Sequence, residues 1–463
     1  MCFESFKTLK EQISSHKNLL KWIFMNGILW AVCWGHVFTI PSLASKNTRL
    51  KVPLNFTLHD LLHGGNDSQV GCDPEEPFCG LIWIRLVFFV AFAVSQFSIG
   101  FLADVFGPFK VLEIVLTILT LSGIAVIIST NIYIFCAAWL VVGFTCTSVF
   151  VLLISQILEQ LDTRTQSWKW RLSIGCLFQM SWIFGRFLSH LLVYIYDDWV
   201  SVMAVLTIML SFILLVLKRQ IWNKEFTKRP KYPGSFKALK RSGNQTFMNM
   251  FLLSMTFFAI GYNYYGNLNN FDRNEPDPVE TSKHNFLQTL LQLVAQIMTL
   301  LICLAVRRKC LPLAFIQFML SVIYFVLFSY HPKTIDDSES KAIFSVNNMI
   351  TILTHLSTFL VTASFDLIWI IAPETFPKEF RNTCTGICSG AARLGAITGI
   401  IVSELKVLDA SYVLLTAGCF VLVSAFLIEL LPDMTKHNLP NTPEDLMSVQ
   451  FPDKRKNSIN ENV

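Results

Sequence analysis

One segment places ionisable side chains where the chain otherwise reads as membrane-embedded. Residues 372–399, APETFPKEFRNTCTGICSGAARLGAITG, lie between two strongly apolar runs and carry five such groups: Glu374, Lys378, Glu379, Arg381 and Arg393. A charge at bilayer depth is costly, so it faces a cavity or a partner and marks a path for ligands or ions. An arginine placed there is able to hold a carboxylate through two parallel hydrogen bonds.

Arg393 is the deepest of these charges. It lies about twelve residues beyond Arg381, which on a helix that rises 1.5 Å per residue puts it roughly 15 Å or more further in. Small residues surround it at about four-residue spacing, Gly386, Gly390, Gly395 and Gly399 with Ala391, and predict close helix packing. Two hypotheses remain: Arg393 binds a substrate carboxylate, or it is a structural arginine satisfied by backbone carbonyls or by Asp366.

Asp366 interrupts a second apolar run, TASFDLIWI. It either forms an internal salt bridge with Arg393 or Arg186, or provides a site for a cationic group or a proton. If it pairs with Arg393, a substrate carboxylate has to compete with it, which would make an exchange switch.

Arg186 and His190 are four residues apart and therefore share a helix face. Arg186 either reaches toward Asp197 and Asp198 at the end of its helix or contributes a positive lining for entering anions.

Aromatic side chains gather in the stretch SMTFFAIGYNYYGNLNNF, residues 254–271. Rings provide faces for cationic or aromatic ligands, and phenols provide hydrogen bonds. Such stripes are more often packing, and only further evidence favours a ligand role for Phe257, Tyr264 and Tyr265.

The composition requires a membrane protein. Of 463 residues, 53% are hydrophobic and 15% charged, with 40 phenylalanines, whereas soluble domains carry about 25% charged residues. The chain holds no phosphate-binding loop, dinucleotide fingerprint, zinc-protease helix or nucleophile elbow. These observations exclude an ATPase module and the usual enzyme classes, and they indicate no nucleic-acid partner, cofactor or metal. We expect energy from gradients or exchange.

Twelve segments are long and apolar enough to cross a bilayer as helices. We place them near residues 20–43, 81–104, 111–129, 132–155, 172–195, 199–217, 248–268, 286–305, 312–330, 343–371, 383–404 and 409–431. The apolar run 111–155 has to be divided in two, and Ser129-Thr130-Asn131 is the polar break that divides it.

Lys and Arg near the span ends predict that both termini face the cytosol, because positive residues concentrate on that side. The loop 44–80 is then outside, where Asn55 and Asn66 form glycosylation sequons. Cys72 and Cys79 lie in the same loop, and an oxidising compartment favours a disulfide there, with free thiols as the alternative.

The predicted spans form two groups of six. Residues 1–19 are a cytosolic N-terminus, 20–217 a first bundle, 218–247 a basic cytosolic linker, 248–431 a second bundle, and 432–463 a cytosolic tail. We therefore predict an all-α membrane protein with twelve transmembrane helices in two six-helix bundles, the major facilitator fold.

Five motifs resemble the organic cation/anion/carnitine transporter family, solute carrier family 22. The segment after residue 372 is similar to that family's AELYPTxxRNxGxGxxSxxSRxGS, and residues 254–271 to its WFxxxxxYYGLxxxxxxF. GFLADVFGPFKVL (100–112), YDDW (196–199) and LPDMTKHNLPNTPEDLM (431–447) resemble its GxLxDRFGRRxxL, RDW and LPETxGxxLPxTxxDL. The likeness extends from about residue 85 to 447 and is more specific in the second half.

The resemblance implies roles for several residues. Glu374, Arg381 and Asp104 match family positions that form a conformational latch at the cytosolic mouth. Arg393 matches a position that is acidic in cation carriers and arginine in anion and carnitine carriers. Tyr264 and Tyr265 match the family's YYG, with Phe257 in place of its Trp, and are expected to touch substrate.

The departures from the family matter as well. Val105, Pro108 and Phe109 replace basic residues of the 100–112 loop, and VLKRQIW stands where the family has PESPRWL. A lysine that anion carriers often place in the eighth span is replaced at Ala295, beside Gln296, which favours a monovalent anion or a zwitterion over a dianion.

These features predict a plasma-membrane carrier of small organic ions that works by alternating access, with organic anions or carnitine-like zwitterions as substrates. An organic cation carrier that uses Asp366 is one alternative, and a transport-deficient regulator or scaffold is another. The terminal ENV resembles a ligand for a PDZ protein.

Overall fold

The computed structural model describes most of the chain from residue 79 to residue 450. The described residues are 28–29, 32, 79–165, 168–196, 199–221, 239–240, 242–271, 278–306, 308–330, 340–404, 408–435, 437 and 439–450. The predicted first span, residues 20–43, therefore lies almost wholly outside them.

Long helices dominate the described residues, which contain no strand. The N-terminal half comprises α4 (Cys79–Phe106), α5 (Pro108–Ile128), α6 (Ile132–Thr165), α7 (Trp168–Tyr196) and α8 (Trp199–Ile221). The C-terminal half comprises α10 (Gly243–Phe271), α11 (Pro278–Val306), α12 (Cys310–Tyr330), α13 (Ser340–Thr375), α14 (Arg381–Glu404), α15 (Ala410–Ile428) and the short α16 (Pro443–Gln450). These eleven long helices match the second to twelfth predicted spans, and the all-α prediction is confirmed.

The helix breaks follow local sequence. Gly107, at φ 91°, ends the turn after α4, and Pro108 begins α5, since proline is favoured at the first position of a helix. The expected division of the run 111–155 is confirmed, because α5 ends at Ile128 and α6 begins at Ile132. The Asn131 side chain accepts the backbone N–H of Tyr133 at 2.8 Å and so satisfies one of the free donors at that helix start.

Nine of the described helices are apolar enough over 18 residues to cross a membrane, and α8 contributes the shorter apolar stretch Val200–Leu215. α10 falls outside this group because Asn249, Asn263 and its tyrosines dilute an otherwise apolar helix. The chain is thus a multi-pass membrane protein.

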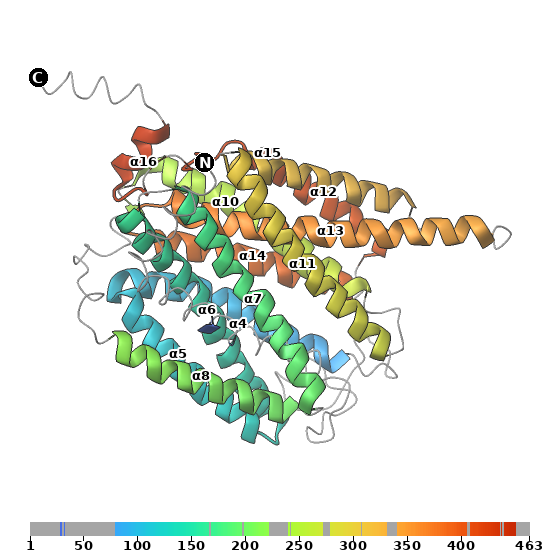
Figure 1. Cartoon of the computed structure of the whole chain (residues 1–463), viewed down its shortest axis with the longest axis horizontal. Helices are drawn as coiled ribbons and strands as arrows, with labels where there is room; N and C mark the ends of the chain where they lie inside the picture. Colours follow the sequence, from blue (N-terminus) through green and yellow to red (C-terminus); the bar gives the residue numbers. More distant parts are fainter. Residues whose placement is uncertain are drawn as a thin grey trace, which may run out of the picture.

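The two halves meet mainly along two helix pairs. In Figure 1, α4, α5, α6 and α8 lie on one side of the molecule and α10 to α15 on the other. α14 packs against α4, and α7 packs against α11, with smaller contacts of α6 with α13 and α14 and of α7 with α13. Within the C-terminal half, α14 also packs closely on α10.

Glycines allow α14 to approach both of its neighbours. A Cβ on Gly386 would overlap the Gln96 carbonyl oxygen of α4, and one on Gly395 would overlap the Phe258 carbonyl oxygen of α10. Gly390 lies against the Phe97 ring. The close packing predicted for these three glycines is confirmed, and it fixes the depth and direction of Arg393 on the same helix.

Candidate functional site

A cavity opens between the two halves at the level of Arg393. Its lining has polar and aromatic groups from the N-terminal half and mainly aromatic groups from the C-terminal half: Phe92, Gln96, Thr147, Phe150, Gln179, Trp182, Tyr264, Tyr265, Phe365, Trp369 and Arg393. The cavity volume that is open to water is about 20 Å³. That volume suffices for water but not for an organic ion, so this structure shows the site in a closed arrangement.

Arg393 provides the cation of this cavity. Its side chain is 2% exposed, its Nη1 donates to the Tyr265 hydroxyl at 2.8 Å, and its guanidinium carbon lies 3.8 Å from the Phe92 ring centroid. Such contacts attract a cation without neutralising its charge. Its Nε has no hydrogen-bond partner, and no carboxylate of the described residues lies within 4 Å of the guanidinium.

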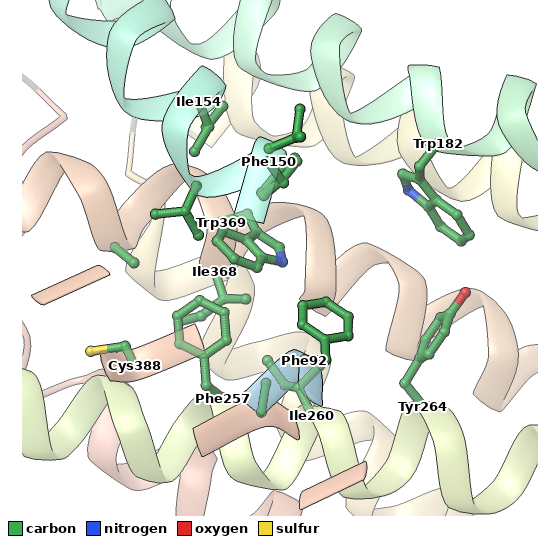
Figure 2. Close-up of a cluster of buried hydrophobic side chains, with 14 of the residues drawn as sticks. Phe92, Phe150, Ile154, Trp182, Phe257, Ile260, Tyr264, Ile368, Trp369 and Cys388 are labelled. Carbon is green, nitrogen blue, oxygen red and sulfur yellow. The ribbon is translucent and has the colours of Figure 1, made fainter. Parts of the chain in front are cut away.

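Aromatic rings form the walls around Arg393. The Tyr264 ring lies 4.9 Å from Tyr265 and 6.0 Å from Trp182, and Figure 2 shows Trp182 and Tyr264 facing each other from α7 and α10. Because Tyr264 and Tyr265 come from the C-terminal half and Trp182 from the N-terminal half, the walls belong to both halves.

Phe257 lies one layer behind this wall. Its ring packs 5.2 Å from Trp369, Trp369 packs 4.3 Å from Phe150, and Figure 2 shows Trp369 between these two phenylalanines. Phe257 is fully buried and does not line the cavity. Phe257 thus lies outside the lining in this arrangement, and its contact with substrate stays a prediction.

Asp366 does not pair with Arg393. Its Oδ1 accepts a hydrogen bond from Gln296 Nε2 at 2.9 Å, and its Oδ2 has no partner. α13 turns this carboxyl group toward α11, whereas α14 turns Arg393 toward α10 and α4. The salt bridge of Asp366 with Arg393 or Arg186, one of the two alternatives for this residue, is therefore absent from this structure.

Arg186 joins the two halves through an amide. Its Nη1 donates to Gln292 Oε1 at 3.1 Å, and Gln292 Nε2 contacts the Tyr264 hydroxyl at 3.3 Å. Arg186 is buried and lies outside the cavity lining. It reaches the cavity indirectly, through Gln292 and Tyr264.

A buried charge cluster closes the end where α13 finishes and α14 starts, which is predicted to face the cytosol and is called the inner end below. Lys309 Nζ contacts the two Glu374 oxygens at 2.7 and 2.6 Å, and Arg171 Nε lies 3.5 Å from Glu374. Arg171 belongs to the N-terminal half, so Glu374 links the halves.

The segment before α16 also takes part in the inner end. Arg171 donates to the His437 carbonyl oxygen at 2.8 Å, and Arg381 donates to the carbonyl oxygens of Phe376 at 3.0 Å and Pro440 at 3.2 Å. Arg381 thus fastens this segment to the start of α14.

Asp104 on α4 reaches across the interface to α14. Its carboxylate accepts the Asn382 side-chain amide at 2.7 Å, the Thr383 backbone N–H at 2.7 Å and the Thr383 hydroxyl at 2.6 Å. The N–H of Thr383 lies in the first turn of α14 and has no acceptor within its own helix. Asp104 therefore caps a helix of the other half.

Sequence reasoning missed three kinds of residue at these sites. Gln292 and Gln296 form, with Gln288, a buried amide stripe at four-residue spacing on α11, a signal visible in the sequence. Arg171 and Lys309 are among the Lys and Arg residues near the span ends, which the sequence marks only as positive charges that set orientation. The polar lining groups Gln96, Thr147 and Gln179 lie within strongly apolar helices and carry no motif.

Several predicted features lie outside the described residues: Asn55, Asn66, Cys72 and the terminal ENV. Cys79 is the first residue of α4. Glycosylation, the disulfide and the PDZ ligand remain predictions.

No known protein-family profile matches the chain. Its curated relatives include human organic cation/carnitine transporter 2, 29% identical over 23% of this chain and 19% of that protein. Another is Xenopus laevis solute carrier family 22 member 6-A, 29% identical over 26% of this chain and 22% of that protein. Mouse solute carrier family 22 member 12 is 36% identical over 18% of this chain and 15% of that protein. The matched segments span about a fifth of each relative.

The whole fold has a known counterpart. The structure of the proton:xylose symporter XylE of the major facilitator superfamily, bound to 6-bromo-6-deoxy-D-glucose, aligns with a TM-score of 0.67. The alignment covers 94% of this chain and 99% of XylE at 15% sequence identity. The chain therefore has the major facilitator fold.

Proposed function

We propose that this protein carries small organic ions across a membrane by alternating access, and that its substrates are organic anions or carnitine-like zwitterions. The cavity between the two halves is the binding site, and Arg393 holds the substrate carboxylate. Tyr264 and Tyr265 contact the part of the substrate that lies beyond its carboxylate.

The observation that carries this proposal is the unneutralised charge of Arg393. A fully buried guanidinium needs a counter-charge or a complete set of hydrogen-bond acceptors. Arg393 has one phenolic acceptor and aromatic faces, while its Nε lacks a partner. A carboxylate in the cavity would supply both the missing charge and a bidentate acceptor.

The rest of the lining indicates the shape of the substrate. Seven aromatic residues, Phe92 among them, surround the cavity. The amide groups of Gln96 and Gln179 lie on the wall formed by the N-terminal half. This arrangement suits a ligand with one carboxylate and an apolar or cationic body. A dianion would find no second cation in the lining.

The relatives support transport of organic ions, because the names of the curated proteins include an organic cation/carnitine transporter and members of solute carrier family 22. The XylE likeness supports a carrier fold. By the resemblance to solute carrier family 22 we propose a plasma-membrane location, and by the distribution of Lys and Arg near the span ends we propose that both termini lie in the cytosol.

The inner end fits the latch of such a carrier. Glu374 with Arg171, and Asp104 with Thr383, join the two halves there. Separation of the halves at this end would break these contacts, and Arg381 would hold the segment before α16 in place. We propose that Glu374, Arg381 and Asp104 stabilise the arrangement that is closed toward the cytosol.

The organic cation alternative has less support. Asp366, the carboxylate that it requires, lies outside the cavity lining and is 2% exposed. A cationic substrate in the cavity would instead meet Arg393.

An uptake assay in oocytes tests the proposal with three labelled probes: p-aminohippurate as an aromatic monocarboxylate, L-carnitine as a zwitterion and tetraethylammonium as a cation. We expect the wild type to take up one of the first two. Arg393→Ala should reduce that uptake by about tenfold to a hundredfold, because a hydrogen bond to a charged group contributes about 1.5–3 kcal/mol. Arg393→Lys should restore part of it.

Arg308→Ala provides the matched control, since Arg308 is exposed, and surface labelling verifies that each variant reaches the membrane. Uptake of anions that survives Arg393→Ala would refute the assignment of the site. Uptake of tetraethylammonium alone would favour the cation carrier. Absence of uptake for all probes despite surface expression would favour a regulator or scaffold.

A further inference from the structure

Asp366 and Gln296 leave two acceptor atoms buried without a donor. Gln296 Nε2 donates to Asp366 Oδ1 at 2.9 Å, while Asp366 Oδ2 and Gln296 Oε1 have no partner. Asp366 is 2% exposed and Gln296 is 1% exposed, so solvent does not satisfy these oxygens. An unpaired buried carboxylate costs far more free energy than a neutral, hydrogen-bonded one.

A single proton would supply the kind of donor that these two oxygens lack. On Oδ2 it converts the carboxylate into a neutral carboxyl group with one donor, and Gln296 Oε1 is an acceptor on the residue already bound to Oδ1. The result is a carboxyl–amide pair with a donor and an acceptor on each partner. Asp366 lies outside the cavity lining, whereas Phe365 and Trp369 on the same helix belong to it, so the cavity does not bring a larger cation into contact with Asp366.

The groups around Asp366 do not replace that proton. Cys176 on α7 and Tyr264 on α10 are close enough to interact with it electrostatically. Further charged or titratable groups on the elements packed against α13 include Cys146 on α6, Arg171, Arg186 and His190 on α7, Tyr262 and Tyr265 on α10, Cys303 on α11, Lys309 before α12, Cys310 and Tyr324 on α12, and Cys384, Cys388 and Arg393 on α14. α13 itself also carries His355 and Glu374. Arg186 binds Gln292, and Lys309 binds Glu374.

We propose that Asp366 with Gln296 is a proton-binding site, and that one proton bound there crosses the membrane together with one monovalent organic anion bound at Arg393. The proposal rests on the anion-carrier function proposed above. It assigns to Asp366 a role separate from substrate contact.

Charge balance supports the coupling. In the empty carrier a negative Asp366 and a positive Arg393 cancel each other within the membrane. When a carboxylate neutralises Arg393, the charge of Asp366 remains, and moving a charge through the bilayer is costly. Protonation of Asp366 removes that charge, so the loaded carrier is neutral again in this region.

A short chain of contacts connects the two sites. Phe365, next to Asp366, lies 5.7 Å from the guanidinium carbon of Arg393 and 5.2 Å from the Tyr264 ring. On α11, Gln292 and Gln296 are one turn apart, and Gln292 contacts Tyr264. A change at the Asp366–Gln296 pair therefore reaches the cavity wall through both α13 and α11.

Purified protein in liposomes tests the proposal, with p-aminohippurate and L-carnitine as probes. Wild type should accumulate the transported probe about tenfold for an inward proton gradient of about one pH unit, because each pH unit corresponds to a factor of ten in proton activity. Imposed membrane potentials should have no effect on the uptake of p-aminohippurate. Asp366→Asn should lose gradient-driven accumulation and retain exchange of labelled for unlabelled probe at equal pH.

His190→Gln and His355→Gln are the matched controls, since histidine is the usual titrating group near neutral pH. Loss of proton coupling in either of these, or its persistence in Asp366→Asn, would overturn the proposal. Accumulation driven by a sodium gradient in place of a proton gradient would overturn it as well. Failure of the wild type to exchange labelled for unlabelled probe at equal pH would count against the carrier function itself. This outcome separates the carrier hypothesis from the proton-coupling hypothesis.

Infrared difference spectroscopy gives a second readout that needs no pH gradient. At about pH 7 and with the transported probe bound, wild type minus Asp366→Asn should show the C=O stretch of a protonated carboxyl group, and Gln296→Leu should shift that band by removing its hydrogen-bond partner. A spectrum that shows only a carboxylate band for Asp366 would overturn the proposal regardless of the transport results.

Discussion

The carboxylate of Asp104 accepts the backbone N–H of Thr383 at 2.7 Å, so a side chain of α4 caps the first turn of α14. The two residues are far apart in sequence and belong to opposite halves of the molecule. A negative group at a helix N-terminus is also favoured by the helix dipole. This contact stabilises the closed inner end without an ion pair.

Asp104→Ala should open the inner end. The variant loses an acceptor for the Thr383 backbone and hydroxyl and the Asn382 amide, and hydrogen bonds to a charged group contribute about 1.5–3 kcal/mol each. We expect at least tenfold faster thiol labelling of the buried Cys384, one residue beyond Thr383, in a background without other reactive cysteines. Asp104→Asn keeps one acceptor, so its labelling rate should lie between those of the wild type and Asp104→Ala. Equal labelling rates in all three proteins would contradict the capping role.

Glu374→Gln should destabilise the fold. Lys309 and Arg171 are buried beside Glu374, and removal of one partner from a buried charge cluster costs about 3–5 kcal/mol. The measurement is the midpoint of thermal unfolding in detergent. The double variant Glu374→Leu/Lys309→Met removes opposite charges together and should recover part of the loss; an unchanged midpoint in Glu374→Gln would show that the cluster is hydrated.

Tyr265→Phe should weaken substrate binding while leaving the fold intact. The variant keeps the aromatic face near Arg393 and loses the hydroxyl that orients Nη1 at 2.8 Å. We expect KM to rise about tenfold with little change in the maximal rate, since a hydrogen bond to a charged group contributes about 1.5–3 kcal/mol.

Tyr262→Phe is the matched control for that variant, because the Tyr262 hydroxyl bonds Thr416 on α15, away from the cavity lining. Initial rates of uptake over a range of probe concentrations distinguish the two. If Tyr262→Phe raises KM as much as Tyr265→Phe, the effect comes from helix packing in the C-terminal half and not from the orientation of Arg393.

The sequence was sufficient for the fold but only partly for the site. Span lengths and the break at 129–131 predict the helices, because bilayer thickness and local polarity determine them. The family signature points to Arg393, and the glycines at four-residue spacing on the same helix predict its close packing. Neither the signature nor the glycine pattern reveals where the Asp366 side chain points, because that direction depends on the rotation of α13 about its own axis.

The sequence cannot predict hydrogen-bond partners that are backbone carbonyl groups outside the helices, for a different reason. Arg381 and Arg171 bind carbonyl oxygens of Pro440 and His437, and every residue has a carbonyl group, so no side-chain pattern marks these positions. Gln292 and Gln296 could have been found, since amides at four-residue intervals on an apolar helix predict a buried polar face.

The two close neighbours of Arg393 belong to different halves. Tyr265 is on α10, which packs against α14 with glycine-to-backbone contact, while Phe92 is on α4. In the proposed transport cycle, separation of the halves at this level would move Tyr265 together with the arginine and withdraw Phe92 from the guanidinium face. The Phe92 ring would thus cover that face only while the site is closed, and its withdrawal would widen the space beside the N–H edge that can bind a carboxylate.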